Sequence, residues 1–512
     1  MRRSGRREFL RRAGVSLAAA TAAGRLARAA PAARDLPNIV FILADDMGYG
    51  DLNCQNPESK IPTPHLDRLA AESMRFTDAH APTSVCTPTR YAILTGRYCW
   101  RSSLKRGVLW AWGRPLIEDG RLTVGGLLKR HGYRTGCVGK WHLGWDWRTA
   151  DGEVVLGGGA GGGNVDRIDF RKPVAGGPLT KGFDYYFGTA VPNFPPYCFL
   201  ENDRTVGIPT VPKPKTMFGH PGPMLPGWKL EEILPGLEAK AVEFVDRHVK
   251  AAPDRPFFLY FPLTGPHTPI APTKEFQGKT KAGAYGDFVH QIDHHVGRLL
   301  AALKRSGVAD NTLVIFTSDN GSPCRDGTAM SGPVGSVRRL GHDPSRPWRG
   351  LKSDAWDGGH RVPFLARWPG RIQAGAVSDE PICHVDFLAT VAALLGEALP
   401  EDAGEDSHNL LPVLLGRPYR RPLREAIVHH SGNGMFAVRQ GQWKLILGRG
   451  SGGFSKPSSV RPKPGEPKGQ LYDLRADPAE QHNLWSERQD VVRRLTALLD
   501  KYKHAGRSVP RP

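Results

Sequence analysis

Two long apolar runs, each ending in acidic or amide residues and then glycine, most constrain how this chain can fold. The first run, NIVFILADD, spans residues 38–46, and the second, TLVIFTSDNG, spans residues 312–321. A third run, PFFLYFPL, covers residues 256–263. Continuous apolar runs of this length are typical of strands that are buried on both faces of a sheet.

Segments with the apolar spacing of amphipathic helices lie between and after these runs. They cover residues 65–74, 239–249, 286–307 and 384–396. Strands that alternate with helices over more than 300 residues predict an α/β fold, in which helices flank a large, mostly parallel sheet. Ligands of such sheets bind at the carboxyl ends of the strands, so we expect the functional site there.

The sequence pattern changes beyond about residue 420. Short segments (AIVHH, MFAVRQ, WKLILG and QLYDL) are separated by turn-forming residues, and DVVRRLTALLDKY follows with helical spacing. This pattern predicts a small antiparallel sheet and a C-terminal helix. We therefore expect an N-terminal signal at residues 1–29, a main domain at 37–418 and a smaller C-terminal α+β subdomain at 419–512.

Residues 1–29 have the order of charge and hydrophobicity of an export signal. MRRSGRREFLRRAG is basic, VSLAAATAAG is apolar, and an ARA site follows at residues 27–29. RREFL at residues 6–10 resembles the bacterial twin-arginine signal. The apolar stretch is shorter than the roughly 20 residues that span a bilayer. We expect the twin-arginine export machinery to deliver the protein to the periplasm or the extracellular space.

The formal net charge of +20 includes this signal. Residues 1–29 contribute +7 of it, which leaves +13 for the rest of the chain. No basic and aromatic module typical of nucleic-acid binders accompanies the surplus, so we expect a polyanionic substrate and no nucleic-acid partner. No later segment has 18 uninterrupted apolar residues, and we expect no stable membrane insertion.

Two matched pairs of oxygen-bearing residues close the first and second apolar runs: Asp45-Asp46 and Asp319-Asn320. Four such ligands from adjacent strand ends suit a hard cation, Ca²⁺ or Mg²⁺ rather than Zn²⁺. Neighbours in an ideal strand point to opposite faces, so each pair converges only where its strand breaks, and we expect Gly48 and Gly321 to allow that break. One pair alone would be explained as acidic turn residues capping a strand; two pairs favour the cation site.

The segment Cys86-Thr87-Pro88-Thr89-Arg90 is the most informative of the chain. Pro88 suits the first turn of a helix that runs to residue 95, with Gly96 as its end. Cys86 then lies at the helix N-terminus, which favours an anion, and Arg90 lies on the same helix face. A lone cysteine beside an arginine is usually a core thiol next to a surface charge, but CTPTR followed by LTGR is more specific.

With these segments the chain resembles the formylglycine sulfatases of the alkaline-phosphatase-like superfamily, near arylsulfatase A and N-acetylgalactosamine-6-sulfatase. C-x-P-x-R followed by LTGR is that family's modification signature. NIVFILADDMGYGD, GKWHLG, GPHTP, TSDNG, LKSDAWDGGHRVP and LYDLRADPAEQHNL extend the resemblance from about Pro37 to near the C-terminus. It implies an alkaline-phosphatase-like fold and a Cys86 that a formylglycine-generating enzyme oxidises to Cα-formylglycine (3-oxoalanine) before folding.

The resemblance also implies the remaining site residues. The catalytic set is Cys86, Arg90, Lys140, His142, His267 and Lys352, and the metal set is Asp45, Asp46, Cys86, Asp319 and Asn320. Lys140 and His142 are two residues apart, so on an extended segment they would face one side. The cation implied is Ca²⁺ in preference to Mg²⁺. Each of these lysines and histidines alone would more often be a solvated lysine or a hydrogen-bonded core histidine.

The resemblance implies a sulfuric ester hydrolase that releases sulfate from an aryl or, by preference, a carbohydrate sulfate monoester. One hydroxyl of the hydrated aldehyde would attack sulfur while His267 assists the leaving oxygen. The second hydroxyl would lose its proton to His142 and expel sulfate. An ordinary serine or cysteine nucleophile lacks that second hydroxyl and would trap the sulfated intermediate.

Two alternatives stay open at this point: a phosphonate or phosphodiester hydrolase of the same superfamily, and a catalytically silent binder of sulfated polysaccharide. The stretch 190–227 is rich in proline and is either a long loop near the site or solvated decoration. Trp100, Trp110 and Trp112 either stack on sugar rings or pack in the core. We expect Asp357 to be structural.

Overall fold

The computed structural model describes residues 36–155, 157 and 164–510. The export signal expected at residues 1–29 lies outside the described residues. In the part of the chain that is described, none of the helices has both the length and the apolar character needed to cross a bilayer.

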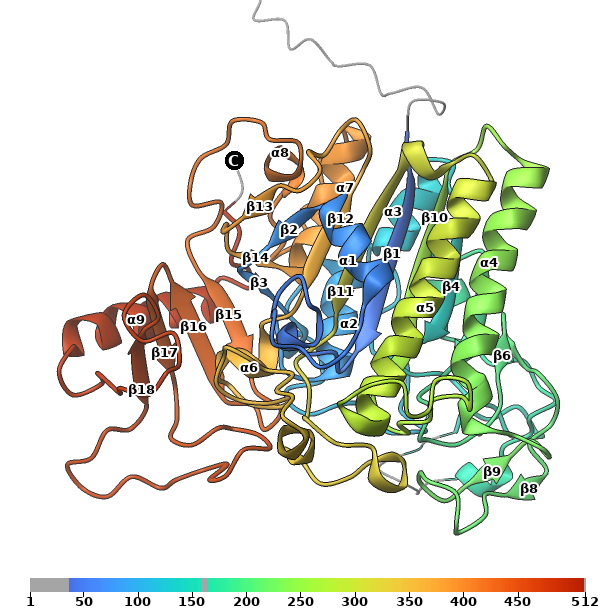
Figure 1. Cartoon of the computed structure of the whole chain (residues 1–512), viewed down its shortest axis with the longest axis horizontal. Helices are drawn as coiled ribbons and strands as arrows, with labels where there is room; N and C mark the ends of the chain where they lie inside the picture. Colours follow the sequence, from blue (N-terminus) through green and yellow to red (C-terminus); the bar gives the residue numbers. More distant parts are fainter. Residues whose placement is uncertain (1–35, 156, 158–163, 511–512) are drawn as a thin grey trace, which may run out of the picture. The chain divides into compact units, whose positions relative to one another are not determined.

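The predicted α/β fold is confirmed, with a ten-stranded mixed sheet at its centre (Figure 1). The strand order is β13-β2-β12-β11-β1-β10-β4-β5-β6-β7. The parallel centre consists of β11 (Thr312–Ser318), β1 (Asn38–Asp45), β10 (Phe257–Pro266), β4 (Arg134–Lys140) and β5 (Tyr185–Thr189). The flanking strands are β13 (Val377–Ser378), β2 (Met74–Phe76), β12 (Phe364–Arg367), β6 (Leu200–Glu201) and β7 (Arg204–Thr205).

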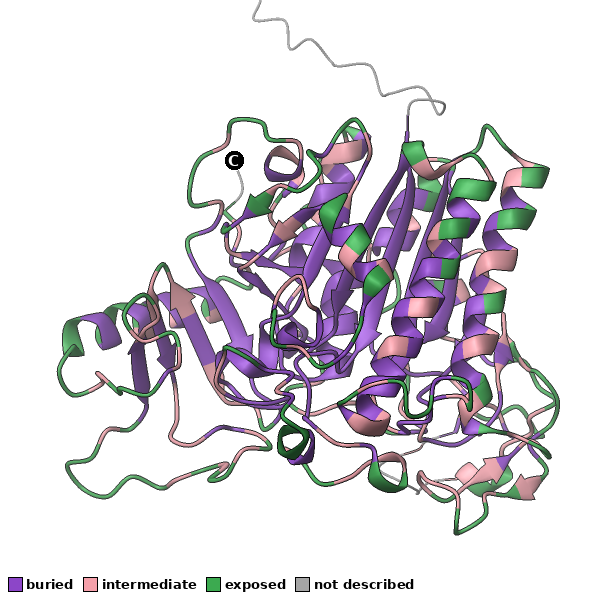
Figure 2. Cartoon of the chain, viewed as in Figure 1, coloured by how far each residue is buried: buried purple, intermediate pink, exposed green. Residues whose placement is uncertain are grey.

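Helices cover both faces of this sheet, which explains why β1 is apolar at every position from residue 39 to residue 44. Ile39, Phe41 and Leu43 share one core with α2 (Cys86–Thr95), α3 (Val124–Arg130) and α7 (Phe387–Leu395). Val40 and Ile42 share the other core with α1 (Pro64–Ala71), α4 (Ile233–Ala251) and α5 (Gly283–Arg305). Figure 2 shows the central strands β1, β10 and β11 buried along their length, while α4 and α5 expose one side only.

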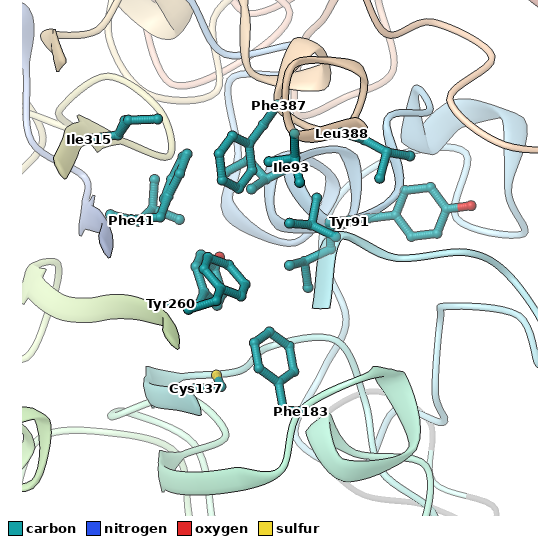
Figure 3. Packing of buried hydrophobic residues seen from close by; sticks show 14 of the residues in the cluster. Phe41, Tyr91, Ile93, Cys137, Phe183, Tyr260, Ile315, Phe387 and Leu388 are labelled. Carbon is teal, nitrogen blue, oxygen red and sulfur yellow. The ribbon is translucent and has the colours of Figure 1, made fainter. Parts of the chain in front are cut away.

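Aromatic packing joins β1 to its neighbours in the first of these cores (Figure 3). The ring of Phe41 lies 4.6 Å from that of Phe387 in α7 and 6.0 Å from that of Tyr260 in β10, centroid to centroid. Tyr91 and Ile93 of α2 pack into the same cluster. This packing fixes α2 against the sheet and so fixes the position of Cys86, its first residue.

The expected helical segments are present as α1, α4, α5 and α7, and α3 forms without having been expected. α1 ends at Ala71, before Met74 begins β2. The largest difference is at α4. This helix begins at Ile233, six residues before the expected start at residue 239. Pro235 lies in its first turn, where proline's missing N–H breaks no helical hydrogen bond, so Pro235-Gly236 does not delay the start of the helix.

The expected C-terminal sheet is also present, as four antiparallel strands in chain order. They are β15 (Ile427–His430), β16 (Phe436–Gln440), β17 (Trp443–Ile446) and β18 (Gln470–Asp473), and α9 (Gln489–His504) packs on β16 and β17. The remaining elements are β3 (Ala79–His80), β14 (Ile382–Cys383), β8 (Val211–Pro212), β9 (Pro223–Met224), α6 (Asp357–His360) and α8 (Leu411–Leu414). The boundary at residue 419 stays a prediction, since the described residues on both sides of it group into one unit.

A buried ion network joins the small sheet to the main sheet. Lys444 of β17 is fully buried and places Nζ 2.7 Å from Oδ1 of Asp357 and 2.8 Å from Oε1 of Glu480. Arg361 binds Asp357 at 2.8 Å and Asp78 at 2.8 Å. Asp357 therefore has the structural role expected from the sequence.

Replacing Lys444 by methionine leaves Asp357 and Glu480 buried without their shared cation. Because breaking a buried ion pair strands an uncompensated charge, we expect Lys444→Met to lower the free energy of unfolding by about 3–5 kcal/mol. The control is Lys501→Met, whose exposed ammonium lies 3.8 Å from Glu425 and should contribute less than about 1 kcal/mol. Urea denaturation measures both; equal midpoints for the two variants would contradict the account.

Candidate active site at the carboxyl ends of the parallel strands

Four adjacent strands, β11, β1, β10 and β4, bring most of the expected polar residues to one edge of the sheet. Asp45 is the last residue of β1 and Lys140 the last of β4, while Asp319 directly follows β11 and His267 directly follows β10. Because β1, β10, β4 and β11 run parallel, their carboxyl ends meet at the same edge. Residues more than 270 positions apart in the sequence are therefore in contact: the backbone N–H of Asp46 donates to Oδ1 of Asp319 at 3.1 Å.

The break that lets Asp45 and Asp46 converge lies at Asp46 and not at Gly48. Asp46 itself has a φ of 70°, in the left-handed region. Gly48 has a φ of −78°, and Gly321 is likewise outside the left-handed region, so neither glycine supplies the expected break. Both glycines are needed for close packing instead: a Cβ would lie 2.1 Å from the Pro344 carbonyl oxygen at Gly48, and 1.9 Å from that of Gly358 at Gly321.

Cys86 begins α2, as the sequence predicts, and Gly96 ends that helix with a φ of 64°. The thiol is buried, with Sγ 3.6 Å from Oδ1 of Asp45 and 3.4 Å from Nζ of Lys352. Burial raises the pKa of the Cys86 thiol to about 12, although Lys140 and Lys352 oppose the shift. At neutral pH an unmodified Cys86 is a protonated thiol and a poor nucleophile.

Three carboxylates and three cations surround Cys86 in a closely paired cluster. Arg90 binds Asp319 at 2.6 Å and lies 3.5 Å from Asp45. Lys140 binds Asp45 at 2.6 Å, and Lys352 binds Asp46 at 2.6 Å. Burial acts to raise the pKa of Asp45, but the neighbouring cations, Lys140 foremost, outweigh it and lower that pKa. The six charges balance, so the cluster itself has no surplus positive charge for an anionic ligand.

His142 is positioned by a turn and not by an extended segment, which corrects the expected geometry. β4 ends at Lys140, and His142 has a φ of 54°. Its Nε2 lies 2.9 Å from the Leu109 carbonyl oxygen, so Nε2 carries the hydrogen and donates. Nδ1 is buried and has no hydrogen-bond partner among the described residues. Burial, followed by Lys140 and Arg90, lowers the pKa of His142 well below its usual value, which leaves the ring neutral with a free lone pair on Nδ1.

His267 faces the cluster from the end of β10, the strand between β1 and β4, with the other ring nitrogen pointing inward. Its Nδ1 donates to the Thr268 carbonyl oxygen at 2.5 Å, and its Nε2 lies 3.9 Å from Oδ2 of Asp46. Burial, with Lys352 and Lys140, lowers the pKa of His267 well below its usual value. The two histidines therefore offer different atoms, Nδ1 of His142 and Nε2 of His267.

The oxygen ligands of the cluster fit a hard divalent cation. Ligand atoms of Asp45, Asp46, Cys86 and His267 all lie within 4.8 Å of one another. Asn320 donates through Nδ2 to Oδ1 of Asp46 at 2.7 Å, and its Oδ1 is buried without a hydrogen-bond partner in the described chain. An unpaired buried amide oxygen next to paired carboxylates is a suitable ligand for Ca²⁺ or Mg²⁺.

Several residues near the site were not singled out from the sequence. Leu109 binds His142 through its carbonyl, and its N–H donates to Oγ1 of Thr87 at 3.2 Å. Phe194 places its ring 6.1 Å from that of His142, and Arg325 interacts electrostatically with Asp46. Phe194 belongs to the proline-rich stretch 190–227, so part of that stretch lies near the site; its composition was the only available signal.

Comparisons with known proteins identify the family that the chain resembles and agree with its fold. The family model described as Sulfatase matches residues 37–397. An N-acetylgalactosamine-6-O-sulfatase of Bacteroides thetaiotaomicron is 34% identical over 506 residues, covering 91% of this chain and 93% of the relative. Human arylsulfatase A is 35% identical over 492 residues, covering 92% of this chain and 86% of that relative. A solved structure from work on glycosaminoglycan metabolism by Bacteroides thetaiotaomicron superposes with a TM-score of 0.78 at 32% identity, covering 92% of this chain and 100% of that one.

The close approach at Gly48 supplies a test of the local packing. A methyl group there would overlap the Pro344 carbonyl, so we expect Gly48→Ala to lower the free energy of unfolding by about 1–3 kcal/mol. Gly126→Ala in α3 is the matched control, because its Cβ would lie 3.3 Å from Thr123 Oγ1 and alanine favours helix by about 0.5–1 kcal/mol. Thermal unfolding of both variants checks this, and a Gly48→Ala protein as stable as the parent would refute it.

Proposed function

The chain belongs to the sulfatase family, and on that premise we propose that it hydrolyses a carbohydrate sulfate monoester at Cys86, after that residue is converted to Cα-formylglycine. The chain is a sulfuric ester hydrolase. The carbohydrate substrate is supported by the N-acetylgalactosamine-6-O-sulfatase that is 34% identical to it.

The observation that carries the proposed modification is the burial of Cys86 among charged groups that do not ionise it. A cysteine nucleophile must be a thiolate, yet burial raises the pKa of this thiol to about 12. Nζ of Lys352 lies 3.4 Å from Sγ of Cys86, where it is suited to bind an oxyanion formed at residue 86. The hydrated aldehyde supplies two hydroxyls on one carbon, one that attacks sulfur and one whose later deprotonation releases sulfate.

We assign the cation to Asp45, Asp46, Asp319 and Asn320, with Cys86 completing the set in its modified form, and prefer Ca²⁺ to Mg²⁺. The paired charges of the cluster support this assignment, because three carboxylates cancel Arg90, Lys140 and Lys352. A sulfate monoester adds one negative charge, which is unfavourable in a buried site without compensation. A bound divalent cation supplies that compensation and withdraws charge from the ester oxygens.

The chain's own residues then bind the ester and move two protons. Lys140 and Lys352 reach the centre of the cluster and bind sulfate oxygens. His267 turns Nε2 towards the same centre and donates a proton to the leaving alcohol oxygen; the negative charge of the bound ester raises its pKa towards the value this needs. Nδ1 of His142 accepts the proton from the second hydroxyl, since Nε2 is held as a donor by Leu109. Arg90 holds Asp319 and Asp45 in place, helps to lower the pKa of Asp45, and opposes the rise in the pKa of Asp319 that burial and Asp45 cause.

We also propose that the protein is exported in folded form, after a formylglycine-generating enzyme has acted on it. The support is the twin-arginine-like segment at residues 6–10 and the order of basic, apolar and small residues over 1–29. Folding and modification of Cys86 in the cytoplasm would precede such export.

Substrate assays separate the proposed activity from the alternatives. We expect sulfate release from a panel of monosulfated monosaccharides that includes N-acetylgalactosamine 6-sulfate, and much slower phosphate release from 4-nitrophenyl phosphate than sulfate release from 4-nitrophenyl sulfate. Cys86→Ala should lower the rate by about 10⁴-fold or more, because the nucleophile is lost. Cys383→Ala, at another buried thiol outside the cluster, should keep the parent activity. Faster release of phosphate, or an active Cys86→Ala variant, would contradict the proposal.

Metal binding is tested without turnover. We expect Ca²⁺ added to chelator-treated protein to raise the thermal midpoint, by an amount equivalent to about 2.7 kcal/mol at 100 times Kd, and Mg²⁺ to raise it less. Asn320→Ala removes the unpaired amide oxygen and should shrink the shift. Asp490→Asn, at an exposed position of α9, is the control and should leave the shift unchanged. The assignment fails if neither ion stabilises the parent, or if Asn320→Ala responds like the parent.

A further inference from the structure

Trp110 differs from the other two tryptophans that follow the cysteine signature. Trp100 and Trp112 are buried, and they pack against Tyr98 and Trp147 respectively. Trp110 is 45% exposed, which is unusual for so large an apolar side chain in the described part of the protein. Exposing an indole forgoes the burial of a large apolar surface, so its position calls for a ligand or partner.

The Trp110 ring is supported on one face and at its edge, and part of the side chain stays exposed to solvent. Phe194 stacks on it, with ring centroids 5.4 Å apart and planes 16° apart. His220 packs edge-on against both rings, at 5.4 Å from Trp110 and 5.0 Å from Phe194. The indole is therefore held in one orientation by its own neighbours, and a ligand ring would not have to order it on binding.

The backbone places this aromatic group beside the catalytic cluster. Leu109, the preceding residue, donates its N–H to Oγ1 of Thr87, the neighbour of Cys86, and accepts from Nε2 of His142. Phe194, which supports the indole, also contacts the ring of His142 edge-on at 6.1 Å. Two separate connections thus fix Trp110 next to the residues that bind and cleave the ester.

We propose that Trp110, backed by Phe194 and His220, is the platform on which a sugar ring of the substrate stacks while its sulfate ester occupies the site at Cys86. This inference rests on the proposed hydrolysis of a carbohydrate sulfate. A pyranose ring presents an apolar C–H face that matches one open aromatic face, and its hydroxyl edge stays in contact with water. Exposed Lys105 and Arg106, from the same segment, provide positive charge for further sulfate groups of a polyanionic glycan.

The test measures KM and kcat of three variants and compares each with the parent value. The substrate is the monosulfated monosaccharide of the panel that the parent hydrolyses fastest. Trp110→Ala should raise KM about tenfold with little change in kcat, because stacking acts on the bound substrate and the transition state alike. Trp110→Phe should restore most of the affinity. Trp485→Ala removes a partly exposed tryptophan of the C-terminal part and should leave KM unchanged.

Two further measurements make each outcome decisive. Titration of the same sugar sulfate into Cys86→Ala and Cys86→Ala/Trp110→Ala protein measures Kd without turnover, and the second should bind about tenfold more weakly. The inference is overturned if folded Trp110→Ala protein has the same KM and Kd for the sugar sulfate as the parent. It is also overturned if Trp110→Ala raises the KM for 4-nitrophenyl sulfate but not for the sugar sulfate. If the parent releases sulfate from none of the sugars, the carbohydrate proposal itself fails, which is a different result.

Discussion

The buried guanidinium of Arg90 is the interaction on which the rest of the site depends. It binds Asp319 at 2.6 Å, lies 3.5 Å from Asp45, and donates to the Lys140 carbonyl oxygen at 3.1 Å. One side chain of α2 thereby joins the ends of β11, β1 and β4, and the same helix carries Cys86 at its first residue. Hydrogen bonds between charged partners are strong and directional, so α2 and the sheet edge are held in one register.

The C-terminal sheet contributes to the site although none of the assigned residues lies on it. The loop that carries Lys352 is held by backbone hydrogen bonds on two sides. The Ser353 N–H donates to the Ser84 carbonyl at 2.7 Å, and the Gly432 N–H, from the turn between β15 and β16, donates to the Ser353 carbonyl at 2.9 Å. Lys352 thus sits between the segment before Cys86 and the small sheet. A few residues after Lys352, Asp357 pairs with Lys444 and so attaches the same small sheet to the main sheet. This attachment explains why a second buried ion network lies beside the one at Cys86.

Much of the fold and the convergence of the acidic and amide residues could be predicted from local sequence patterns, whereas the lysines and histidines of the site were identified through the family resemblance. Continuous apolar runs specify strands buried on both faces, and acids at their ends must meet where parallel strands end. Cys86, Pro88 and Gly96 likewise specify α2 through helix chemistry alone. The backbone at Asp46 and His142 could not be predicted, because tertiary contacts hold both in the left-handed region. The sequence also could not predict that Trp110 is exposed while Trp100 and Trp112 are buried. The position of Trp110 depends on Phe194 and His220, which come from a loop distant in the sequence.

The central claim is that catalysis requires the converted form of Cys86, and mass spectrometry of the peptide around that residue tests it most directly. Protein preparations with different degrees of conversion can be compared by plotting specific activity against the fraction of peptide that carries the aldehyde. The account predicts a straight line through the origin, because the buried thiol is protonated at neutral pH and inert. Full activity in protein whose Cys86 is entirely an unmodified thiol would contradict it.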